Sequence, residues 1–291
     1  MNLFAFGLGY TARALVAAER PRLASVAGTV RSPEAGGAWA HRGVALRLFS
    51  EAGADPAVHD DLKRAEVVLV SIPPDAGGDP SLRAFGEALA AAPRVRWVGY
   101  LSTVGVYGDH GGAWVDEATP PSPMSERARR RVLAEEQWLD WGRRTGRAVH
   151  VFRLAGIYGP GRNALVNLAA GTARRIVKPG QVFNRIHVDD IARALVAAMA
   201  QARPRAVYNL ADDEPAPPQD VVAYAAALLG VEPPPETPIE QATLGAMAAS
   251  FYAENKRVSN RLIKRELGLA WRYPTYREGL KALAADRGGA G

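Results

Sequence analysis

The chain has no cysteine, and it has only five histidines among its 291 residues. The lack of cysteine excludes a disulfide framework and a thiolate metal site, and the histidines show no metal-ligand spacing. No uncharged apolar run approaches the ~20 residues that span a bilayer. The first residues, MNLFAFGLGY, lack the basic region of a secretory signal. We therefore expect a soluble, cytoplasmic protein without a metal site or a membrane contact.

The residues that are present describe a globular protein. Hydrophobic residues make up 48% of the chain and charged residues 23%, which is enough for a sizeable core in one large or two smaller domains. The formal net charge is +6. Such a charge permits an acidic partner such as a phosphate, a nucleotide or a nucleic acid, but does not choose among them.

Short valine-rich apolar runs alternate with longer helical patterns along most of the chain. This alternation is typical of a parallel sheet built from βαβ units. We predict an α/β fold of the Rossmann type, a doubly wound parallel sheet of about seven strands. The expected strands are residues 2–6, 23–30, 44–49, 66–72, 94–101, 148–155 and 206–211.

A glycine-rich turn follows the first of these strands. Gly7 and Gly9 occupy the first two positions of a G-x-G-x-x-G/A pattern, and Ala12 occupies the third. Glycine lets backbone N–H groups approach a pyrophosphate at the N-terminus of the next helix. The position at the first strand–helix turn favours a dinucleotide site over a merely tight turn. The other residues that we expect along this site are Tyr10, Thr11 and Ser71.

The end of the second expected strand, GTVRSP, indicates which dinucleotide binds. An NAD site usually offers an acid about 20 residues after the glycines, for the ribose 2′-OH. Here no acid occurs between Glu19 and Glu34, and Arg31 stands at the strand end. A guanidinium there can pair with a 2′-phosphate, and Arg13 is a second candidate. The pattern favours NADP over NAD. The alternative is that Arg31 is an ordinary surface arginine.

Four further motifs follow in order: LSTVGVYGD (101–109), RLAGIYGPG (153–161), IHVDDIA (186–192) and YNL (208–210). Together with the glycine turn, they resemble the extended short-chain dehydrogenase/reductases, the sugar-nucleotide epimerase/dehydratase group, over nearly the whole chain. The tail NKRVSNRLIKRELGL is similar to the C-terminal segment of that family. The resemblance implies hydride transfer between a nicotinamide cofactor and a small-molecule substrate.

The composition changes after about residue 211, where prolines cluster around a helix that ends at Gly230. We expect a dinucleotide-binding domain formed by residues 1–157 together with 183–210. A smaller, mostly helical substrate lobe would consist of residues 211–291, to which 158–182 contribute.

The family resemblance implies a catalytic hydroxyl after the fifth strand and a Tyr-x-x-x-Lys pair on the next helix. Thr103, four residues before Tyr107, matches the hydroxyl, with Ser102 beside it. The tyrosine and lysine positions fall on Arg127 and Arg131. Arginine stays protonated and cannot act as a general base. We therefore expect an unconventional active site, in which Tyr107 is the first substitute for the proton donor.

These two arginines belong to the stretch SERARRRVLAEEQ, which has four arginines in five positions. The residues of this helix that we expect to face the sheet are Ala128, Val132, Glu135 and Leu139. Arg127 and Arg131 then share one flank, whereas Arg129 and Arg130 point elsewhere. Since the cations do not converge on one side, we expect no specific binding of nucleic acid. An i,i+4 pair between Arg131 and Glu135 is an alternative to cofactor binding.

Five further residues are expected near the substrate: Arg153, Asn163, Asn184, Arg185 and His187. Their basic character suits a phosphorylated or carboxylated substrate, with ordinary surface charge as the alternative. A lone histidine such as His187 is more often packed or hydrogen-bonded. Asp189, at the start of the helix DIARALVAAMA, is predicted to be an N-cap rather than a catalytic acid. Tyr158, like Tyr107, lies in a turn that an aromatic side chain generally packs.

Two classes of function remain open. The first is an NAD(P)-dependent oxidoreductase or epimerase-type enzyme for a carbonyl or nucleotide-sugar-like substrate, with Thr103 orienting the carbonyl. The second is a catalytically impaired NADP-binding sensor or scaffold. Arg127 in place of tyrosine favours the second class. The resemblance to enzymes favours the first, and we slightly prefer the first. A homodimer is compatible with either.

Overall fold

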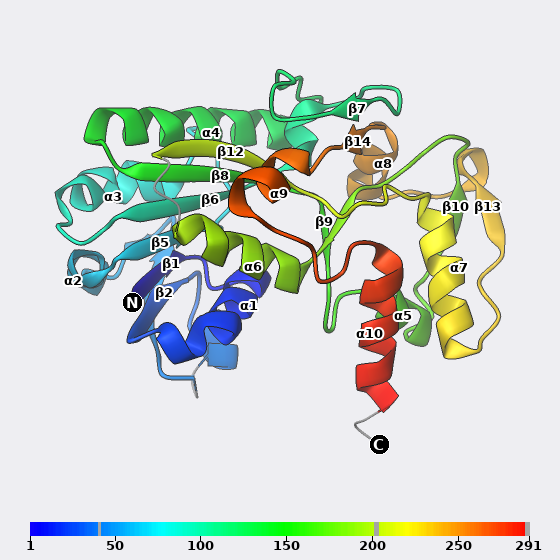
Figure 1. The fold of residues 1–291 in the computed structure, drawn as a ribbon, viewed down its shortest axis with the longest axis horizontal. Coiled ribbons are helices and arrows are strands. Elements are labelled where there is room, and N and C mark those ends of the chain that lie inside the picture. Colours follow the sequence, from blue (N-terminus) through cyan, green and yellow to red (C-terminus); the bar gives the residue numbers. More distant parts are fainter. Residues whose placement is uncertain (40–41, 201–203, 289–291) are drawn as a thin grey trace. The chain divides into compact units, whose positions relative to one another are not determined.

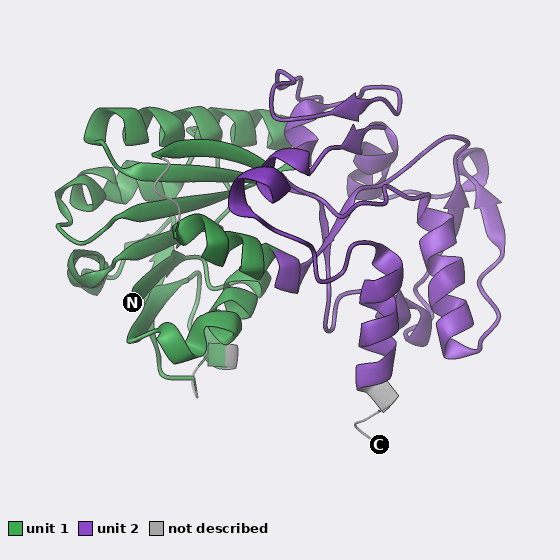
Figure 2. Cartoon of the chain, viewed as in Figure 1, with its two compact units in different colours: residues 1–103, 126–153, 191–208 green, residues 104–125, 154–190, 209–291 purple. Residues whose placement is uncertain are grey.

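The computed structural model describes residues 1–39, 42–200 and 204–288, and the chain divides into two compact units (Figure 2). Unit 1 consists of residues 1–103, 126–153 and 191–208, and unit 2 of 104–125, 154–190 and 209–291. The segments 104–125, 154–157, 183–190 and 209–210 thus belong to unit 2, whereas we expected them in the dinucleotide-binding domain. Two of them hold short strands that pair within unit 2, and composition gives no signal of such distant pairings.

The sheet has eight strands in the order β12-β8-β6-β5-β1-β2-β3-β4 (Figure 1). Its strands are β1 (Asn2–Phe6), β2 (Ser25–Val30), β3 (Val44–Ser50), β4 (Gly53–Ala54), β5 (Val67–Val70), β6 (Trp97–Thr103), β8 (Ala148–Leu154) and β12 (Arg205–Leu210). The seven predicted strands are all present. The additional strand, β4, is a two-residue antiparallel extension of the edge at β3. The prediction of a mostly parallel Rossmann-type sheet is confirmed.

The order of the strands reverses beside β1. The chain runs from β1 outward through β2 to β3, and β5 then returns to pair with the other side of β1, always in parallel. In open α/β sheets, ligands bind at the carboxyl ends of the strands where the order reverses. This places the favoured ligand-binding edge of unit 1 at the ends of β1 and β5.

Helices cover both faces of the sheet (Figure 1). The helices of unit 1 are α1 (Tyr10–Glu19), α2 (Ala57–Arg64), α3 (Pro80–Ala91) and α4 (Glu126–Thr145), with short 3-10 helices at η1 (Arg20–Arg22) and η2 (Glu34–Trp39). Helix α6 (Val188–Met199) begins in the last residues of a unit 2 segment, and its residues from 191 onward belong to unit 1. One hydrophobic cluster joins α2, α3 and α4 to the sheet, for example through the stacked rings of Tyr100 and Trp138.

The buried face of α4 differs in part from the predicted stripe. Ala128 and Glu135 are buried as expected, but Val132 and Leu139 are only partly buried. The remaining buried residues of the helix are Ala134, Trp138, Trp141 and Gly142. Two large indole side chains remove more apolar surface from water than a valine and a leucine do, so their positions set the rotation of the helix.

Unit 2 contains helices and three small two-stranded sheets, β10-β13, β11-β9 and β14-β7. Its helices are η3 (Val104–Tyr107), α5 (Ala164–Ala169), α7 (Pro218–Leu229), η4 (Ile239–Gln241), α8 (Ala246–Tyr252), α9 (Arg261–Leu267) and α10 (Tyr276–Gly288). Its strands are β7 (Trp114–Val115), β9 (Gly156–Tyr158), β10 (Arg175–Val177), β11 (Arg185–His187), β13 (Glu236–Pro238) and β14 (Arg257–Val258). Helix α7 ends at Gly230 with a φ of 65°, as predicted for a C-cap glycine.

Candidate functional site

The turn between β1 and α1 has the geometry of a phosphate-binding loop. Gly7 has a φ of 91°, and a Cβ atom there would lie 2.7 Å from Ser71 Oγ. Its backbone N–H donates to Thr29 Oγ1 at 2.9 Å, and its carbonyl accepts from Ser71 Oγ at 2.7 Å. Glycine is required here both by the positive φ and by this close approach to the end of β5. Ser71 therefore shapes the turn through its hydroxyl.

The start of α1 is open to an anion. Gly9 precedes the helix without any side-chain cap, and the first turn carries no acid. Space around Gly9 is free, because a Cβ atom there would meet no heavy atom within 4 Å. Thr11 and Ala12 are buried beneath the turn, and Tyr10 is half-buried. Uncapped backbone N–H groups at a helix N-terminus suit a phosphate.

Arg13 and Arg31 both extend into solvent from unit 1. Arg13 lies in α1, and Arg31 follows the last residue of β2 directly. Neither guanidinium forms a hydrogen bond or an ion pair with a residue that the structure describes. Both side chains are therefore accessible to an anionic group.

Ser102 and Thr103 end β6 and differ in their surroundings. Ser102 is only 5% exposed, and its hydroxyl donates to Glu135 Oε1 at 2.5 Å. Glu135 also accepts from Arg153, with Nη2 to Oε2 at 2.8 Å and Nε to both oxygens at 3.2 Å. Thr103 is half-buried. The structure therefore places Arg153, expected near the substrate, in a buried ion pair inside unit 1.

Arg131 reaches the same end of the sheet from α4. Its Nη1 donates to Leu101 O at 2.9 Å, to the hydroxyl of Tyr100 at 3.0 Å and to Ile72 O at 3.5 Å. The alternative ion pair with Glu135 is not formed, because that carboxylate faces Arg153 instead. Nε and Nη2 of Arg131 donate to no described residue. One nitrogen thus anchors the side chain, and two remain for a ligand.

The other arginines of the run lie in the first turns of α4. Arg129 and Arg130 both pair with Glu126, and all three side chains are exposed. Both arginines thus lie on the solvated surface of α4. Arg127 is also exposed, in the first turn of the helix. Binding of nucleic acid stays untested.

Three tyrosines, Tyr100, Tyr107 and Tyr158, have buried phenols. Tyr107 is fully buried in unit 2, and its hydroxyl donates to Asn209 Oδ1 at 2.8 Å. Tyr100 is fully buried in unit 1, where burial raises the pKa of its hydroxyl. Tyr158 is 8% exposed, and burial raises the pKa of its hydroxyl as well. These surroundings favour packing over proton transfer for all three residues.

The expected substrate residues of unit 2 hold its backbone together. Asn163 caps α5, with its oxygen accepting from Val166 N at 3.1 Å. Asn184 accepts from Val258 N at 2.8 Å and donates to Lys256 O at 2.9 Å. Each side-chain amide makes the hydrogen bonds that its loop needs to keep its shape. This role accounts for both residues without a ligand.

His187 is packed rather than open. It is 1% exposed and lies against the rings of Tyr158 and Tyr273. Its Nδ1 accepts from the backbone N–H of Asp189 at 3.2 Å. The N-cap prediction for Asp189 is wrong, because α6 already begins at Val188 and Asp189 lies within its first turn. The histidine ring satisfies that first-turn N–H in place of the aspartate.

A buried carboxyl that the sequence reading missed lies next to Arg185. Asp212 is 1% exposed, and its Oδ2 has no hydrogen-bond partner among the described residues. Its backbone N–H donates to Arg185 O at 2.6 Å. Burial raises the pKa of the Asp212 carboxyl well above its usual value, and it lowers the pKa of Arg185, whose Nη1 donates to Phe183 O and Ala216 O.

The raised pKa of Asp212 predicts a stability change with pH. Between the unfolded and the folded pKa only the folded state binds the proton, so stability falls as pH rises through this window and then levels off. Asp212→Asn should remove this decline, which amounts to about 1.4 kcal/mol per pH unit within the window, because the neutral amide neither ionises nor takes up a proton. The variant should therefore be more stable than the parent at neutral pH. Urea unfolding at pH 4.5 and 7.5 would measure both effects. A variant that is less stable than the parent at pH 7.5 would contradict the assignment.

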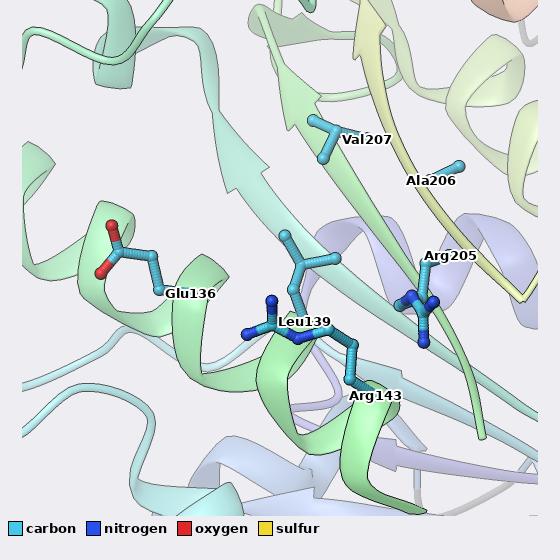
Figure 3. A pocket seen from close by; sticks show the side chains of 6 residues that line it. All are labelled: Glu136, Leu139, Arg143, Arg205, Ala206 and Val207. Carbon is cyan, nitrogen blue, oxygen red and sulfur yellow. The ribbon is translucent and has the colours of Figure 1, made fainter. Parts of the chain in front are cut away.

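An open pocket of about 470 Å³ lies between α4 and β12 (Figure 3). Its lining residues are Glu136, Leu139, Arg143, Arg205, Ala206 and Val207. The residues from β12 are the first three of that strand. The pocket thus lies at the amino-terminal end of its strand, whereas ligands of open α/β sheets bind at the carboxyl ends. We assign no cofactor to it.

In the part of the chain that the structure describes, no group of histidine, aspartate and glutamate side chains is arranged to hold a metal ion. No helix in that part is both long and apolar enough to cross a membrane.

Comparison with known proteins places the chain in a family. The model of the NAD dependent epimerase/dehydratase family matches residues 83–211. Protein YeeZ of Escherichia coli K12 is 33% identical over 198 residues, which cover 65% of this chain and 68% of that protein. The chain belongs to the NAD-dependent epimerase/dehydratase family.

Solved structures share the fold of this chain. A conserved protein of unknown function from Silicibacter pomeroyi is 52% identical, with 98% of both chains covered and a TM-score of 0.89. MoeE5, solved in complex with UDP-glucuronic acid and NAD, is 22% identical with all of both chains covered and a TM-score of 0.78. At that identity, MoeE5 shows a shared fold.

Proposed function

We propose that this chain binds NADP through unit 1 and acts as an oxidoreductase or epimerase-type enzyme on a carbonyl or nucleotide-sugar-like substrate. The observation that carries the proposal is the geometry of the β1–α1 turn. Gly7 approaches Ser71 so closely that no Cβ atom fits between them, and the start of α1 has no side-chain cap. The turn lies where the strand order reverses, and a pyrophosphate fits there. Membership of the family and the NAD-containing structure of MoeE5 support the proposal.

In this proposal the bound cofactor supplies or accepts the hydride, and the chain positions the reactants. Thr103 is the more accessible hydroxyl at the end of β6, and it orients the substrate carbonyl. Arg131, anchored through Nη1, offers its other nitrogens to the cofactor ribose. Arg127 suits an anionic group on the substrate, since a guanidinium pairs well with a carboxylate or a phosphate.

A second candidate function is an NADP-binding sensor or scaffold without turnover. The burial of Tyr107 and Tyr100 favours it, because neither phenol can meet a substrate oxygen in this conformation. The two candidates share the cofactor site and differ only in hydride transfer.

The exposed pair of Arg13 and Arg31 predicts the choice of cofactor. NADPH should raise the melting temperature more than NADH does at equal concentration, because a ligand bound only by the native state stabilises in proportion to its occupancy. Arg31→Ala should abolish the difference. Arg22→Ala is a matched control, since Arg22 is an exposed arginine that pairs with Glu19. Equal or better stabilisation by NADH would show that the 2′-phosphate assignment is wrong.

A further inference from the structure

We infer that Glu135 is a positioning residue. The hydrogen bond that it accepts from the Ser102 hydroxyl, here called the Ser102–Glu135 lock, ties α4 to the end of β6 and so holds Thr103 and Arg131 in place. This inference rests on the proposed function, since it assigns roles within that site. Its basis is the chain of contacts from Arg153 through Glu135 to Ser102, in which every member is at most 5% exposed.

The contacts define which partner donates. Two nitrogens of Arg153 grip the Glu135 carboxylate, and such charge-assisted, forked pairs are the strongest and most directional of side-chain hydrogen bonds. An ionised carboxylate can only accept, so the proton of Ser102 is committed to Glu135. Ser102 can then only accept from any third group. A substrate carbonyl needs a donor, so Ser102 does not suit the role that the proposed function gives to Thr103.

The hydrogen bond between Ser102 and Glu135 also fixes the position of Arg131. Glu135 is one helical turn after Arg131, and residues four apart share a face of α4. Arg131 donates to the carbonyl of Leu101, the residue before Ser102. The helix and the strand are therefore joined by two adjacent links, one at Ser102 and one at Leu101. Loss of the first link should loosen the second, together with the backbone that carries Thr103.

Testing this needs variants that fold. Glu135→Leu with Arg153→Met removes both charges, a replacement that is often neutral or stabilising for a buried ion pair, but it also removes the acceptor for Ser102. Glu135→Gln with Arg153→Met keeps an amide oxygen for that hydroxyl. Ser102→Ala breaks only the link.

A matched control is available in the same unit. Ser81 donates to Asp79 at 2.5 Å, and both residues are fully buried. Ser81→Ala therefore removes a buried serine–carboxylate hydrogen bond of the same length at the start of α3. It should leave the end of β6 unchanged.

The first measurement is amide hydrogen exchange at residues 101–103 and 127–131, without cofactor. We expect exchange to be about tenfold faster in Ser102→Ala and in the leucine double variant, since the loss of one hydrogen bond of about 1.4 kcal/mol corresponds to a tenfold change. Exchange in the glutamine double variant and in Ser81→Ala should stay near the parent rate. Parent-like exchange in the leucine double variant would overturn the inference, whatever the protein's activity.

The second measurement is NADPH affinity together with kcat and KM in the same variants. The lock predicts about tenfold weaker NADPH binding and a lower kcat with KM for the substrate nearly unchanged, since the groups that it holds act on the reacting end of the site. Parent-like NADPH binding and kcat in variants with faster exchange would overturn the positioning role. Faster exchange in a protein that binds no NADPH would support the lock and contradict the proposed function.

Discussion

Arg153→Ala is expected to lower the free energy of unfolding by about 3–5 kcal/mol, because it leaves the carboxylate of Glu135 buried without its counter-charge. The side chains of Arg153 and Glu135 are only 6% and 4% exposed, so water cannot replace the lost partner. Urea unfolding at neutral pH measures the effect.

Arg143→Ala is the matched control for this experiment. Arg143 pairs with Asp140 on the same helix α4, but these side chains are 63% and 47% exposed. An exposed ion pair contributes about 0–1 kcal/mol, so this variant should remain close to the parent. Similar losses in both variants would contradict the view that burial makes the Arg153 pair important.

Hydride transfer to common sugar nucleotides should be slow or absent in the parent, because Arg127 stands where the family resemblance implies the proton-transferring tyrosine. A positioned acid/base contributes about 10²–10⁴-fold to the rate, and an arginine cannot supply it. Arg127→Tyr with Arg131→Lys should therefore raise the rate by up to that factor. The nicotinamide absorbance follows the reaction across a panel of aldehydes, ketones and sugar nucleotides.

The control places the new phenol on the wrong side of α4. Arg130 is paired with Glu126 in solvent, so Arg130→Tyr with Arg131→Lys should bring no gain. Tyr107→Phe should leave any parent rate unchanged, since that hydroxyl is buried against Asn209. Brisk turnover by the parent that Arg127→Ala alone abolishes would show that an arginine supports proton transfer at this position.

Sequence reasoning predicted the glycine turn, at which we propose that the cofactor binds, because its signals are local. Gly7 and Gly9 follow a strand and precede a helix within a few residues, and the backbone of the turn follows from that spacing. All seven predicted strands form for a similar reason, since hydrophobic periodicity acts over neighbouring residues. Arg13 and Arg31 could be proposed together because each has a local marker: Arg13 lies in the helix that follows the glycine turn, and Arg31 follows the end of the next strand.

Glu135 shows where such reasoning stops. Its place in a stripe that faces the sheet was predicted, and a buried carboxylate implies a buried partner. Arg131, four residues away, was the partner that the helix offered. The structure pairs Glu135 with Arg153, which was expected near the substrate, because β8 brings that arginine beside α4 inside unit 1. The nearest partner in sequence was not the nearest in space.

The sequence by itself determined the alternation of strands and helices and the glycine turn, and it placed arginines where the family resemblance implies a tyrosine and a lysine. Each of these depends on a few consecutive residues. Only the tertiary structure decided that Ser102 faces Glu135, that Tyr107 is buried against Asn209, and that the Asp212 carboxyl has no partner for one oxygen. Burial and polar partners arise from contacts between residues far apart in the chain, and periodicity carries no information about which of those residues meet.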